Sequence, residues 1–266
     1  MERTELTALA AELETARVTA TPIEPLTTRH PGLTVDDAYA IQQIGISTRL
    51  DAGSRVVGHK IGLSSKAMQE MLGVDEPDYG HLLDDMVIAT GGAVAAGRLC
   101  QPRVEVEVAY VLKTQLPTSG CTVADVARCT EYVAASIEII DSRIADWNIK
   151  LADTIADNAS SARIVLSPTM IRPDDLDLAT LGATVRINGQ TVGSGAAGAV
   201  LGHPSIAVAW MANKLGSLNV ETSPGDIVLP GSCTKAFDVV PGDLVECRFD
   251  ELGPVSVAFD PTEETK

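Results

Sequence analysis

Two glutamates separated by one residue lie in segment 103–111, R-V-E-V-E-V-A-Y-V, whose alternation is typical of a β-strand. Successive side chains of a strand point to opposite faces, so Glu105 and Glu107 share one face and the valines occupy the other. Two carboxylates this close repel each other on a buried face unless a proton or a cation intervenes. The pair therefore either faces water on a half-exposed strand or forms part of a cation site.

A third carboxylate favours the cation site. Glu138 lies within S-I-E-I-I at 136–140, a short apolar run in which a charge is rarely left without a partner. Three converging carboxylates would supply hard oxygen ligands of the kind that suit Mg²⁺ or Mn²⁺. The sequence contains no HxH, HExxH or CxxC pattern that competes for the metal.

Two further polar islands could add to such a site. In the apolar run 57–63, Gly58 and Gly62 flank Lys60 and would leave room around its ammonium group, although a lone lysine in a strand is usually solvated surface. The loop around Asp78 is also compatible with simple turn chemistry. Segment 153–161, D-T-I-A-D-N-A-S-S, is either a helix cap and turn or a loop that donates hydroxyls and amides to an anion.

The histidines and cysteines carry less chemistry. None of the histidines has a partner at a ligand spacing, so structural roles are expected for His59, His81 and His203. None of the five cysteines has a nearby histidine in a nucleophile pattern, and their odd number without CxxC spacing predicts reduced thiols, not a disulfide frame or a zinc cluster.

Periodicity and turn residues predict the elements that position these groups. The predicted helices are 2–17, 34–50, 65–72, 122–135 and 204–215. Asn188-Gly189, between two β-branched runs, is the strongest hairpin signal. The predicted strands are 104–112, 136–140, 163–166, 183–187, 190–192, 227–229, 237–240, 244–249 and 255–259.

These strands do not alternate regularly with helices, which argues against a doubly wound parallel sheet. We expect an α+β fold in which a strand-rich mixed β core is covered by an N-terminal helical layer. The expected organisation is a helical region at 1–55 packed on the core, a catalytic β-rich domain at 56–260 and a tail at 261–266, forming one compact unit.

Composition excludes several classes of function. The 266 residues include 20 Lys and Arg against 36 Asp and Glu, a formal charge of −16 that disfavours nucleic acid and anionic membrane surfaces. The N-terminus lacks the pattern of a signal peptide, and no apolar run approaches the roughly 18 residues of a membrane span. A cytoplasmic protein is expected, with the acidic excess serving solvation, a cation site, or both.

Several long motifs in order resemble those of one family. The chain is similar to the 2-keto-4-pentenoate hydratase and 4-oxalocrotonate decarboxylase family, within the fumarylacetoacetate hydrolase superfamily, over nearly its whole length. The matching segments are G-H-K-I-G-L-S-S-K-A-M-Q (58–69), L-G-V-D-E-P-D-Y-G (72–80), P-R-V-E-V-E-V-A (102–109), E-I-I-D-S-R-I-A-D-W (138–147), D-T-I-A-D-N-A-S-S (153–161), G-S-G-A-A-G-A-V-L-G-H-P (193–204), P-G-D (241–243) and L-G-P-V-S-V-A-F (252–259).

The resemblance implies the fold of that superfamily's C-terminal domain and a Mg²⁺- or Mn²⁺-dependent hydratase of meta-cleavage catabolism of aromatic or steroid compounds. Its substrate would be 2-hydroxypenta-2,4-dienoate or a close homologue such as 2-hydroxyhexa-2,4-dienoate. By the same resemblance, the chain would form a homo-oligomer and could associate with other enzymes of the pathway. The implied residues are Glu105, Glu107 and Glu138 for the metal, Lys60 and Asp78 for catalysis, and Ser160 and Leu72 for substrate.

Three other functions stay open. Two are a decarboxylase of 2-oxo-3-hexenedioate and a hydratase of a dicarboxylic heptenedioate, since Lys235 in G-S-C-T-K (231–235) leaves a second substrate carboxylate possible. The third is a non-catalytic partner subunit, against which the joint presence of all five implied metal and catalytic residues argues. A carbon–carbon hydrolase is disfavoured because no His–Glu pair that would activate water is apparent.

Overall fold

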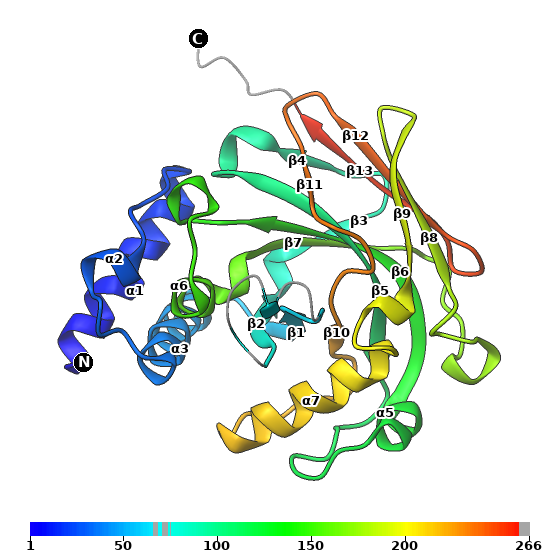
Figure 1. Cartoon of the computed structure of the whole chain (residues 1–266), viewed down its shortest axis with the longest axis horizontal. Helices are drawn as coiled ribbons and strands as arrows, with labels where there is room; N and C mark the ends of the chain where they lie inside the picture. The colour runs from blue at the N-terminus through cyan, green and yellow to red at the C-terminus, as the bar shows by residue number, and fades with distance from the viewer. Residues whose placement is uncertain (66–68, 71–73, 75, 261–266) are drawn as a thin grey trace.

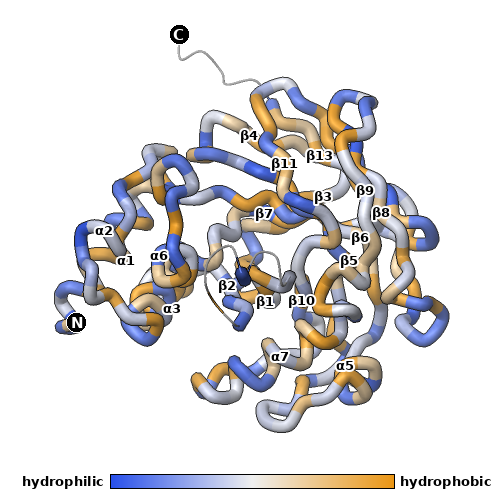
Figure 2. The backbone as a smooth tube through the Cα atoms, in the orientation of Figure 1, coloured by the Kyte–Doolittle hydropathy of each residue, from blue (hydrophilic) through white to orange (hydrophobic). Residues whose placement is uncertain are grey.

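The computed structural model describes residues 1–65, 69–70, 74 and 76–260, which form two β-sheets with helices around them (Figure 1). Hydrophobic residues concentrate along the strands and on one side of the helices, whereas many loops are hydrophilic (Figure 2). Within this described part, no helix has the length and hydrophobicity needed to cross a bilayer.

The N-terminal layer consists of helices packed beside the larger sheet. Residues Thr34 and Asp37 form a reciprocal capping box at the start of α3, as the sequence predicts. The apolar stripe of α1, which includes Leu6, Leu9 and Leu13, is buried. The predicted helices 2–17 and 34–50 are therefore confirmed. The elements are α1 (Arg3–Thr19), α2 (Leu26–Arg29) and α3 (Val35–Asp51).

The larger sheet has eight strands in the order β2-β1-β10-β5-β6-β7-β3, with β11 paired to the edge of β5. Its strands are β1 (Val56–Gly62), β2 (Asp78–Leu83), β3 (Val87–Ala89), β5 (Pro102–Leu112), β6 (Thr130–Asp141), β7 (Ser161–Leu166), β10 (Ile227–Leu229) and β11 (Phe237–Asp238). Short elements join them: η1 (Asp84–Met86), η2 (Ala96–Arg98), α5 (Val123–Cys129), η3 (Ala145–Trp147), α6 (Leu151–Ala156), η4 (Asn158–Ser160) and η5 (Pro173–Asp175).

The smaller sheet has the order β4-β13-β12-β8-β9 and packs on β6 and β7. The predicted hairpin is confirmed: Asn188 and Gly189 both have positive φ, 52° and 76°, as a two-residue turn of this kind requires. The elements are β4 (Ala93–Ala95), β8 (Gly182–Ile187), β9 (Gln190–Ala196), η6 (Ala197–Ala199), α7 (Pro204–Ser217), β12 (Leu244–Phe249) and β13 (Gly253–Asp260).

One predicted helix is wrong over half of its length. The helix expected at 122–135 ends at Cys129, and β6 begins at Thr130 as a strand of twelve residues. It pairs antiparallel with β5 along almost the full length of both strands, so ladder hydrogen bonds override local helical periodicity. The strand expected at 237–240 is also shorter, and the helix expected at 65–72 falls largely outside the described residues.

The predicted fold class, α+β with a mixed β core and an N-terminal helical layer, is confirmed. The strand-face argument for β5 holds on its apolar side, since Val104, Val106 and Val108 are buried in the main hydrophobic core. Side chains of α1 and α3 belong to the same core. The boundary at residue 55 stays a prediction, and the expected tail at 261–266 lies outside the described residues.

Candidate metal centre and active site

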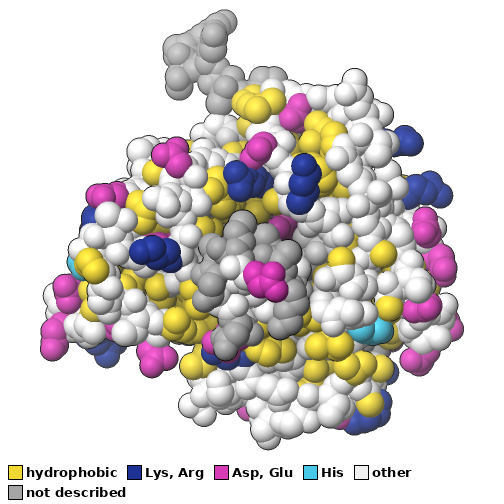
Figure 3. Space-filling model, in the orientation of Figure 1, with side chains coloured by type: hydrophobic (Ala, Val, Ile, Leu, Met, Phe, Trp, Pro, Cys, Tyr) yellow, Lys and Arg dark blue, Asp and Glu magenta, His cyan; other side chains and the backbone are white. Residues whose placement is uncertain are grey.

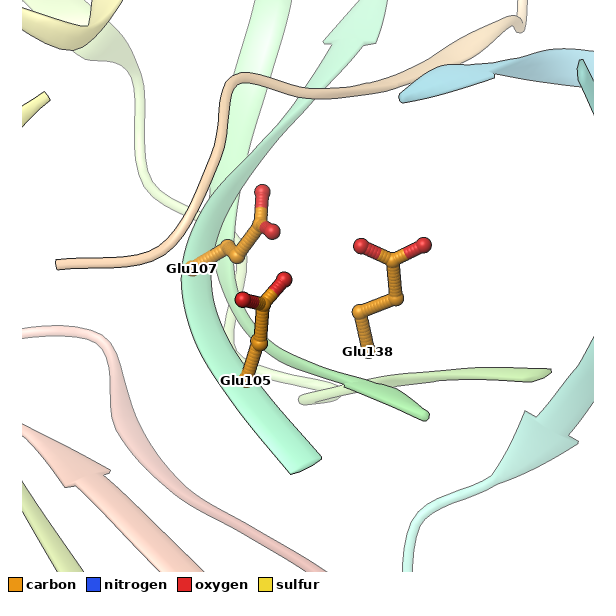
Figure 4. Close-up of side chains that lie close together, drawn as sticks. All are labelled: Glu105, Glu107 and Glu138. Carbon is orange, nitrogen blue, oxygen red and sulfur yellow. The ribbon is translucent and has the colours of Figure 1, made fainter. Parts of the chain in front are cut away.

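The three predicted metal ligands lie together because of the register between β5 and β6. Residue Glu105 stands directly opposite Glu138, and Glu107 stands opposite Ser136, so the three carboxylates share one face of the sheet. Each offers an oxygen atom, and these oxygens lie within 4.8 Å of one another. Figure 4 shows all three side chains pointing into the same space. We call this cluster the acidic cage.

The acidic cage is largely buried, and only some of its carboxylate oxygens accept a hydrogen bond. Glu107 is 1% exposed and Glu138 is 0% exposed, while Glu105 is partly exposed. The backbone N–H of Gly231 donates to Glu107 Oε2 at 2.7 Å, and Ser161 Oγ donates to Glu138 Oε1 at 2.8 Å. Among the described residues, Glu107 Oε1 and Glu138 Oε2 have no hydrogen-bond partner. The reading of β5 as a half-exposed acidic strand is therefore wrong for this face.

Burial and mutual repulsion set the protonation of the cage. Burial raises the pKa of Glu105 to about 7, with Lys60 opposing the shift and Glu138 adding to it. Burial, followed by the charges of Glu138 and Glu105, raises the pKa of Glu107 well above its usual range. Carboxylates held this way with unpartnered oxygens fit a hard divalent cation, which would favour their charged forms.

Lysine 60 lies beside the cage and not on the surface. Its side chain is 4% exposed, and Nζ lies 3.5 Å from Glu138 Oε2. Burial disfavours the ammonium, but the surrounding carboxylates, Glu138 first, raise the pKa of Lys60 above its ordinary value. The solvated-surface alternative for this lysine is excluded. A permanent positive charge therefore faces the acidic cage.

Aspartate 78 begins β2 on the same face as Lys60. It pairs with Gly62, where an added Cβ would lie 2.1 Å from Asp78 Oδ1, so only glycine leaves room for this carboxylate. Thr154 Oγ1 donates to Asp78 Oδ2 at 3.3 Å, and Oδ1 has no partner among the described residues. Burial raises the pKa of Asp78, against the opposing charge of Lys60. The simple-turn alternative for Asp78 is thus wrong.

Segment 153–161 has a structural part and a part that contributes to the site. Its start is structural: Asp153 caps α6 and accepts hydrogen bonds from Thr27 of α2. Its end holds three consecutive non-glycine residues, Asn158, Ala159 and Ser160, at positive φ, a strained conformation typical of functional loops. The loop carries Ser161 to Glu138.

The predicted substrate residues differ in outcome. Ser160 is buried with its hydroxyl 3.4 Å from Asp157 Oδ2, and Leu72 lies outside the described residues. Sequence reasoning missed Thr154, Ser161 and Gly231 as individual partners of the site. The first two lie within the D-T-I-A-D-N-A-S-S segment, which flagged the region but not the residues; Gly231 contributes only its backbone and has no side-chain signal.

The histidines and thiols take no part in the cage. Residues His59 and His81 face each other on β1 and β2, on the sheet face opposite Lys60, with ring centroids 5.0 Å apart. Burial lowers the pKa of His81 to about 4 and lowers the pKa of His59 well below its usual range, which favours the neutral form of both. His203 accepts from the Ser205 N–H at the start of α7, the expected capping role. All five cysteines are free thiols.

Comparison with known proteins places the chain in a family. The model for the fumarylacetoacetate (FAA) hydrolase C-terminal domain matches residues 57–259. The chain belongs to this family. It is 43% identical over 251 residues to the 2-keto-4-pentenoate hydratase of Paraburkholderia xenovorans (strain LB400), covering 94% of this chain and 93% of that protein.

Two further members of the family are similar over almost their whole length. The 2-hydroxyhexa-2,4-dienoate hydratase of Comamonas testosteroni is 43% identical over 242 residues, covering 90% of this chain and 92% of that protein. A solved structure of the 4-oxalocrotonate decarboxylase from Pseudomonas putida G7, complexed with magnesium and adipate, is 37% identical with a TM-score of 0.94, covering 97% and 98% of the two chains. The predicted resemblance is confirmed.

Proposed function

We propose that this chain is a Mg²⁺- or Mn²⁺-dependent hydratase that converts 2-hydroxypenta-2,4-dienoate, or a homologue such as 2-hydroxyhexa-2,4-dienoate, to a 4-hydroxy-2-oxo acid in meta-cleavage catabolism. The observation that carries the proposal is the buried acidic cage with its two unpartnered oxygens beside Lys60. The similarity to hydratases over 94% of the chain supports the reaction class.

The metal would be held by Glu105, Glu107 and Glu138. When bound, a divalent cation acts as a Lewis acid that stabilises negative charge on the oxygens of a chelating 2-oxo or 2-hydroxy acid. Gly231 and Ser161 each fix one carboxylate oxygen of the cage, which leaves the unpartnered oxygens for the cation. Such hydrogen bonds to ligands set their orientation and their basicity.

Lysine 60 would act on the anionic end of the substrate. Its ammonium lies 3.5 Å from Glu138 Oε2, and its raised pKa favours the charged form through the working pH range. A fixed ammonium attracts the substrate carboxylate and stabilises charge on the C2 oxygen when the enol proton leaves. We therefore assign Lys60 to binding and charge stabilisation, not to proton transfer.

Aspartate 78 would move the proton. Its burial, its raised pKa and the absence of a hydrogen-bond partner for Oδ1 among the described residues support a role in proton transfer. The substrate loses its C2 hydroxyl proton and gains a proton at C5, giving 2-oxopent-3-enoate; water then adds OH to C4 and H to C3, giving 4-hydroxy-2-oxopentanoate. Asp78 would donate its proton at C5 while the C2 hydroxyl proton leaves to solvent. The resulting Asp78 carboxylate would then accept a proton from the attacking water, and C3 would take a proton from solvent, so that Asp78 ends protonated as it began.

The far end of the substrate would be uncharged. Arg103 precedes Glu105 by two residues on the same strand, but it is paired with Asp238 at 2.7 Å and lies over the ring of Trp147. The ammonium of Lys235, which left a dicarboxylate possible, lies over the ring of Phe237. Both contacts support a substrate with a single carboxylate. Contacts of Ser160 and Leu72 with this substrate stay predictions.

A decarboxylase of 2-oxo-3-hexenedioate is the second candidate, supported by the similarity in structure to 4-oxalocrotonate decarboxylase. The identity of 37% to that enzyme, against 43% to the hydratases, favours hydration. A heptenedioate hydratase stays open on the same grounds. All three candidates use the same cage and differ in the substrate's far end.

The decisive experiment gives the purified chain Mg²⁺ and, separately, 2-hydroxypenta-2,4-dienoate, 2-hydroxyhexa-2,4-dienoate, 2-oxohept-3-enedioate and 2-oxo-3-hexenedioate. Loss of diene absorbance without release of carbon dioxide supports the hydratase. Carbon dioxide from 2-oxo-3-hexenedioate at a higher kcat/KM would assign the decarboxylase, and preference for the heptenedioate would assign the dicarboxylate hydratase. No turnover of any of these substrates with Mg²⁺ or Mn²⁺ would identify a non-catalytic partner.

Assembly and location stay predictions. A homo-oligomer is checked by light scattering of the purified chain, and association with other pathway enzymes by co-purification. A cytoplasmic location is checked by cell fractionation.

A further inference from the structure

Five arginines converge between the N-terminal helices, η2 and the start of β7, and the β6–β7 register puts Arg163 on the sheet face opposite Glu138. They line two adjoining pockets between the N-terminal helices, the edge of β7 and η2. In a chain with a formal charge of −16, five of the 20 basic residues at one place is a strong local bias. We call these pockets the arginine crevice; its arginines are Arg17, Arg49, Arg98, Arg143 and Arg163.

Three of the five guanidinium groups already have carboxylate partners. Arg17 pairs with Glu14 and Arg49 pairs with Asp85, each at 2.6 Å, while buried Arg143 pairs with Asp157. Among the described residues, Arg98 and Arg163 have no carboxylate within ion-pair distance. These two arginines leave positive charge for an outside partner.

The carboxylate in the crevice wall does not supply that partner. Both oxygens of Asp141 accept backbone N–H groups, from Cys100 at 2.9 Å and Gln101 at 2.6 Å. Asp85 is held from its exposed side by Arg49. The acids that face the crevice are thus committed to other contacts.

Of Arg98 and Arg163, Arg163 has the less favourable environment for a positive charge. It is half-buried on β7, and its Nη1 donates to the carbonyl of Ala162 at 2.8 Å. Burial lowers the pKa of Arg163, and the charges of Arg17 and Arg49 lower it further, against the attraction of Asp85 and Asp141. A bound anion would relieve this repulsion, and guanidinium forks bind phosphate and carboxylate groups in a bidentate manner.

A β-bulge connects the crevice to the acidic cage. Ile139 of β6 pairs with Arg163 and Ile140 pairs with Ser161, so Ala162 is the extra residue on β7. The bulge turns Ser161 toward Glu138, while Arg163 points to the opposite face of the sheet. Without it, residues 161 and 163 would share one face.

Hydrogen bonds run across this bulge. Arg143 Nη1 donates to the carbonyl of Ser161 at 3.1 Å, and Ser161 Oγ donates to Glu138 Oε1 at 2.8 Å. A shift of β7 at Arg163 therefore acts directly on the residue that orients a proposed metal ligand.

From these contacts we infer that the arginine crevice binds a small dianion, either a phosphate group or a dicarboxylate, and that its occupancy changes the metal affinity of the acidic cage. The ligand's two negative charges are met by Arg98 and Arg163. The effect on the cage rests on the proposed metal site, whereas binding of the anion does not.

Anion binding is tested by calorimetry on the metal-free chain, titrated with inorganic phosphate and, separately, with succinate at constant ionic strength. We expect one site for at least one of the two probes, and the tighter probe identifies the ligand chemistry. Arg163→Gln and Arg98→Gln should each weaken binding by about tenfold or more, as loss of a charge-assisted contact predicts. Arg98 is exposed, so its replacement does not threaten folding.

The matched control is Arg248→Gln, an exposed arginine on β12. The Arg248→Gln variant should bind the anion with the same Kd as the unmodified chain. Absence of binding to both probes, or equal affinity in all variants, would overturn the inference. A change of oligomeric state in Arg98→Gln or Arg163→Gln, without anion binding to the unmodified chain, would assign the crevice to contact with a second copy.

The coupling between the arginine crevice and the acidic cage is tested by measuring the Kd of Mg²⁺ with and without a saturating concentration of the anion. We expect a change in the Mg²⁺ Kd of about threefold or more, which must be reciprocal in the anion Kd. Ser161→Ala should abolish the change while anion binding persists. An unchanged Mg²⁺ Kd overturns the coupling. Failure to bind Mg²⁺ at all would contradict the proposed function and leave the anion result standing.

Discussion

The acidic cage concentrates carboxylates on one face of the larger sheet, and the arginine crevice concentrates guanidinium groups between the N-terminal helices and β7. In the cage, three carboxylates share one nearby ammonium, 3.5 Å from Glu138 Oε2, and Glu107 Oε1 and Glu138 Oε2 have no hydrogen-bond partner among the described residues. In the crevice, most guanidinium groups are matched by carboxylates. Carboxylates that are buried together with too few counterions have raised pKa values, whereas most guanidinium groups of the crevice, buried Arg143 included, are each paired with a carboxylate.

The charges of these two clusters differ in their surroundings from most other charges of the molecule. Acidic side chains are spread over the face drawn in Figure 3, from its rim to its centre, and many acidic residues of the chain are exposed. Such charges affect solubility and association more than the fold. The cage and the crevice are the places where charge is concentrated enough to hold a ligand.

Removing one cage carboxylate should produce the largest effect. In Glu107→Gln, the Oε2 contact with Gly231 changes and one anionic ligand is lost, so we expect Mg²⁺ affinity to fall at least about 100-fold and kcat/KM about 1,000-fold. Calorimetry and the diene assay measure the two values. Glu246→Gln, on the exposed face of β12, is the control. Full activity without a metal requirement in Glu107→Gln would refute the metal site.

Replacing Lys60, the positively charged side chain beside the cage, should affect turnover without weakening metal binding. Lys60→Met keeps the length of the side chain and removes the charge beside Glu138. We expect kcat/KM to fall about 100-fold while Mg²⁺ binds at least as tightly, because a competing positive charge is gone. Lys113→Met, at an exposed position, should change neither value. Unchanged turnover would exclude Lys60 from the mechanism.

The protonation of the cage predicts how stability varies with pH. Folded-state pKa values of Glu105, at about 7, and Glu107 are raised by burial, so these groups favour folding while protonated and lose that contribution as pH rises through about 7. The melting temperature of the metal-free chain should fall between pH 5 and 8.

Magnesium at 100 times the Kd measured at pH 8 should stabilise the fold by about 2.7 kcal/mol at pH 8, and the same concentration should stabilise it much less at pH 5, where protonated carboxyls weaken binding. Thermal unfolding with and without Mg²⁺ measures this difference. Equal stabilisation at both pH values would contradict the proposed protonation of the cage. Glu107→Gln should lose the Mg²⁺ effect.

The smallest expected effect concerns the hydrogen bond to Asp78. Thr154→Val removes a contact that lowers the pKa of Asp78, so that pKa should rise further. We expect kcat to fall about threefold to tenfold and the pH–rate profile to move to higher pH. Thr154→Ser keeps the hydroxyl and should restore the profile. A lower rate with an unmoved profile would indicate a structural role only.

The sequence predicted well where local patterns and final contacts agree. The alternation of segment 103–111 placed Glu105 and Glu107 on one face, and the capping residues located α3. The prediction from sequence failed where long-range strand pairing overrode local periodicity. The segment after Thr130 has helical periodicity, but it forms β6 because it pairs with β5.

Two decisive features had no local signal at all. The contact of Gly231 with Glu107 joins residues 124 positions apart through a backbone N–H, which no residue type can predict. The arginine crevice assembles residues from α1, α3, η2 and β7, each unremarkable in its own segment. Both depend on how the layers pack.

The sequence by itself determined the α+β class, the carboxylates of the cage as candidate ligands and, through its motifs, the family. Only the tertiary structure decided that Glu138 stands opposite Glu105, that Lys60 is buried beside them and that a bulge at Ala162 turns Ser161 and Arg163 to opposite faces. Side-chain direction along one strand follows from its period of two. Register between strands, and the charge each side chain then meets, follows from packing across the whole chain.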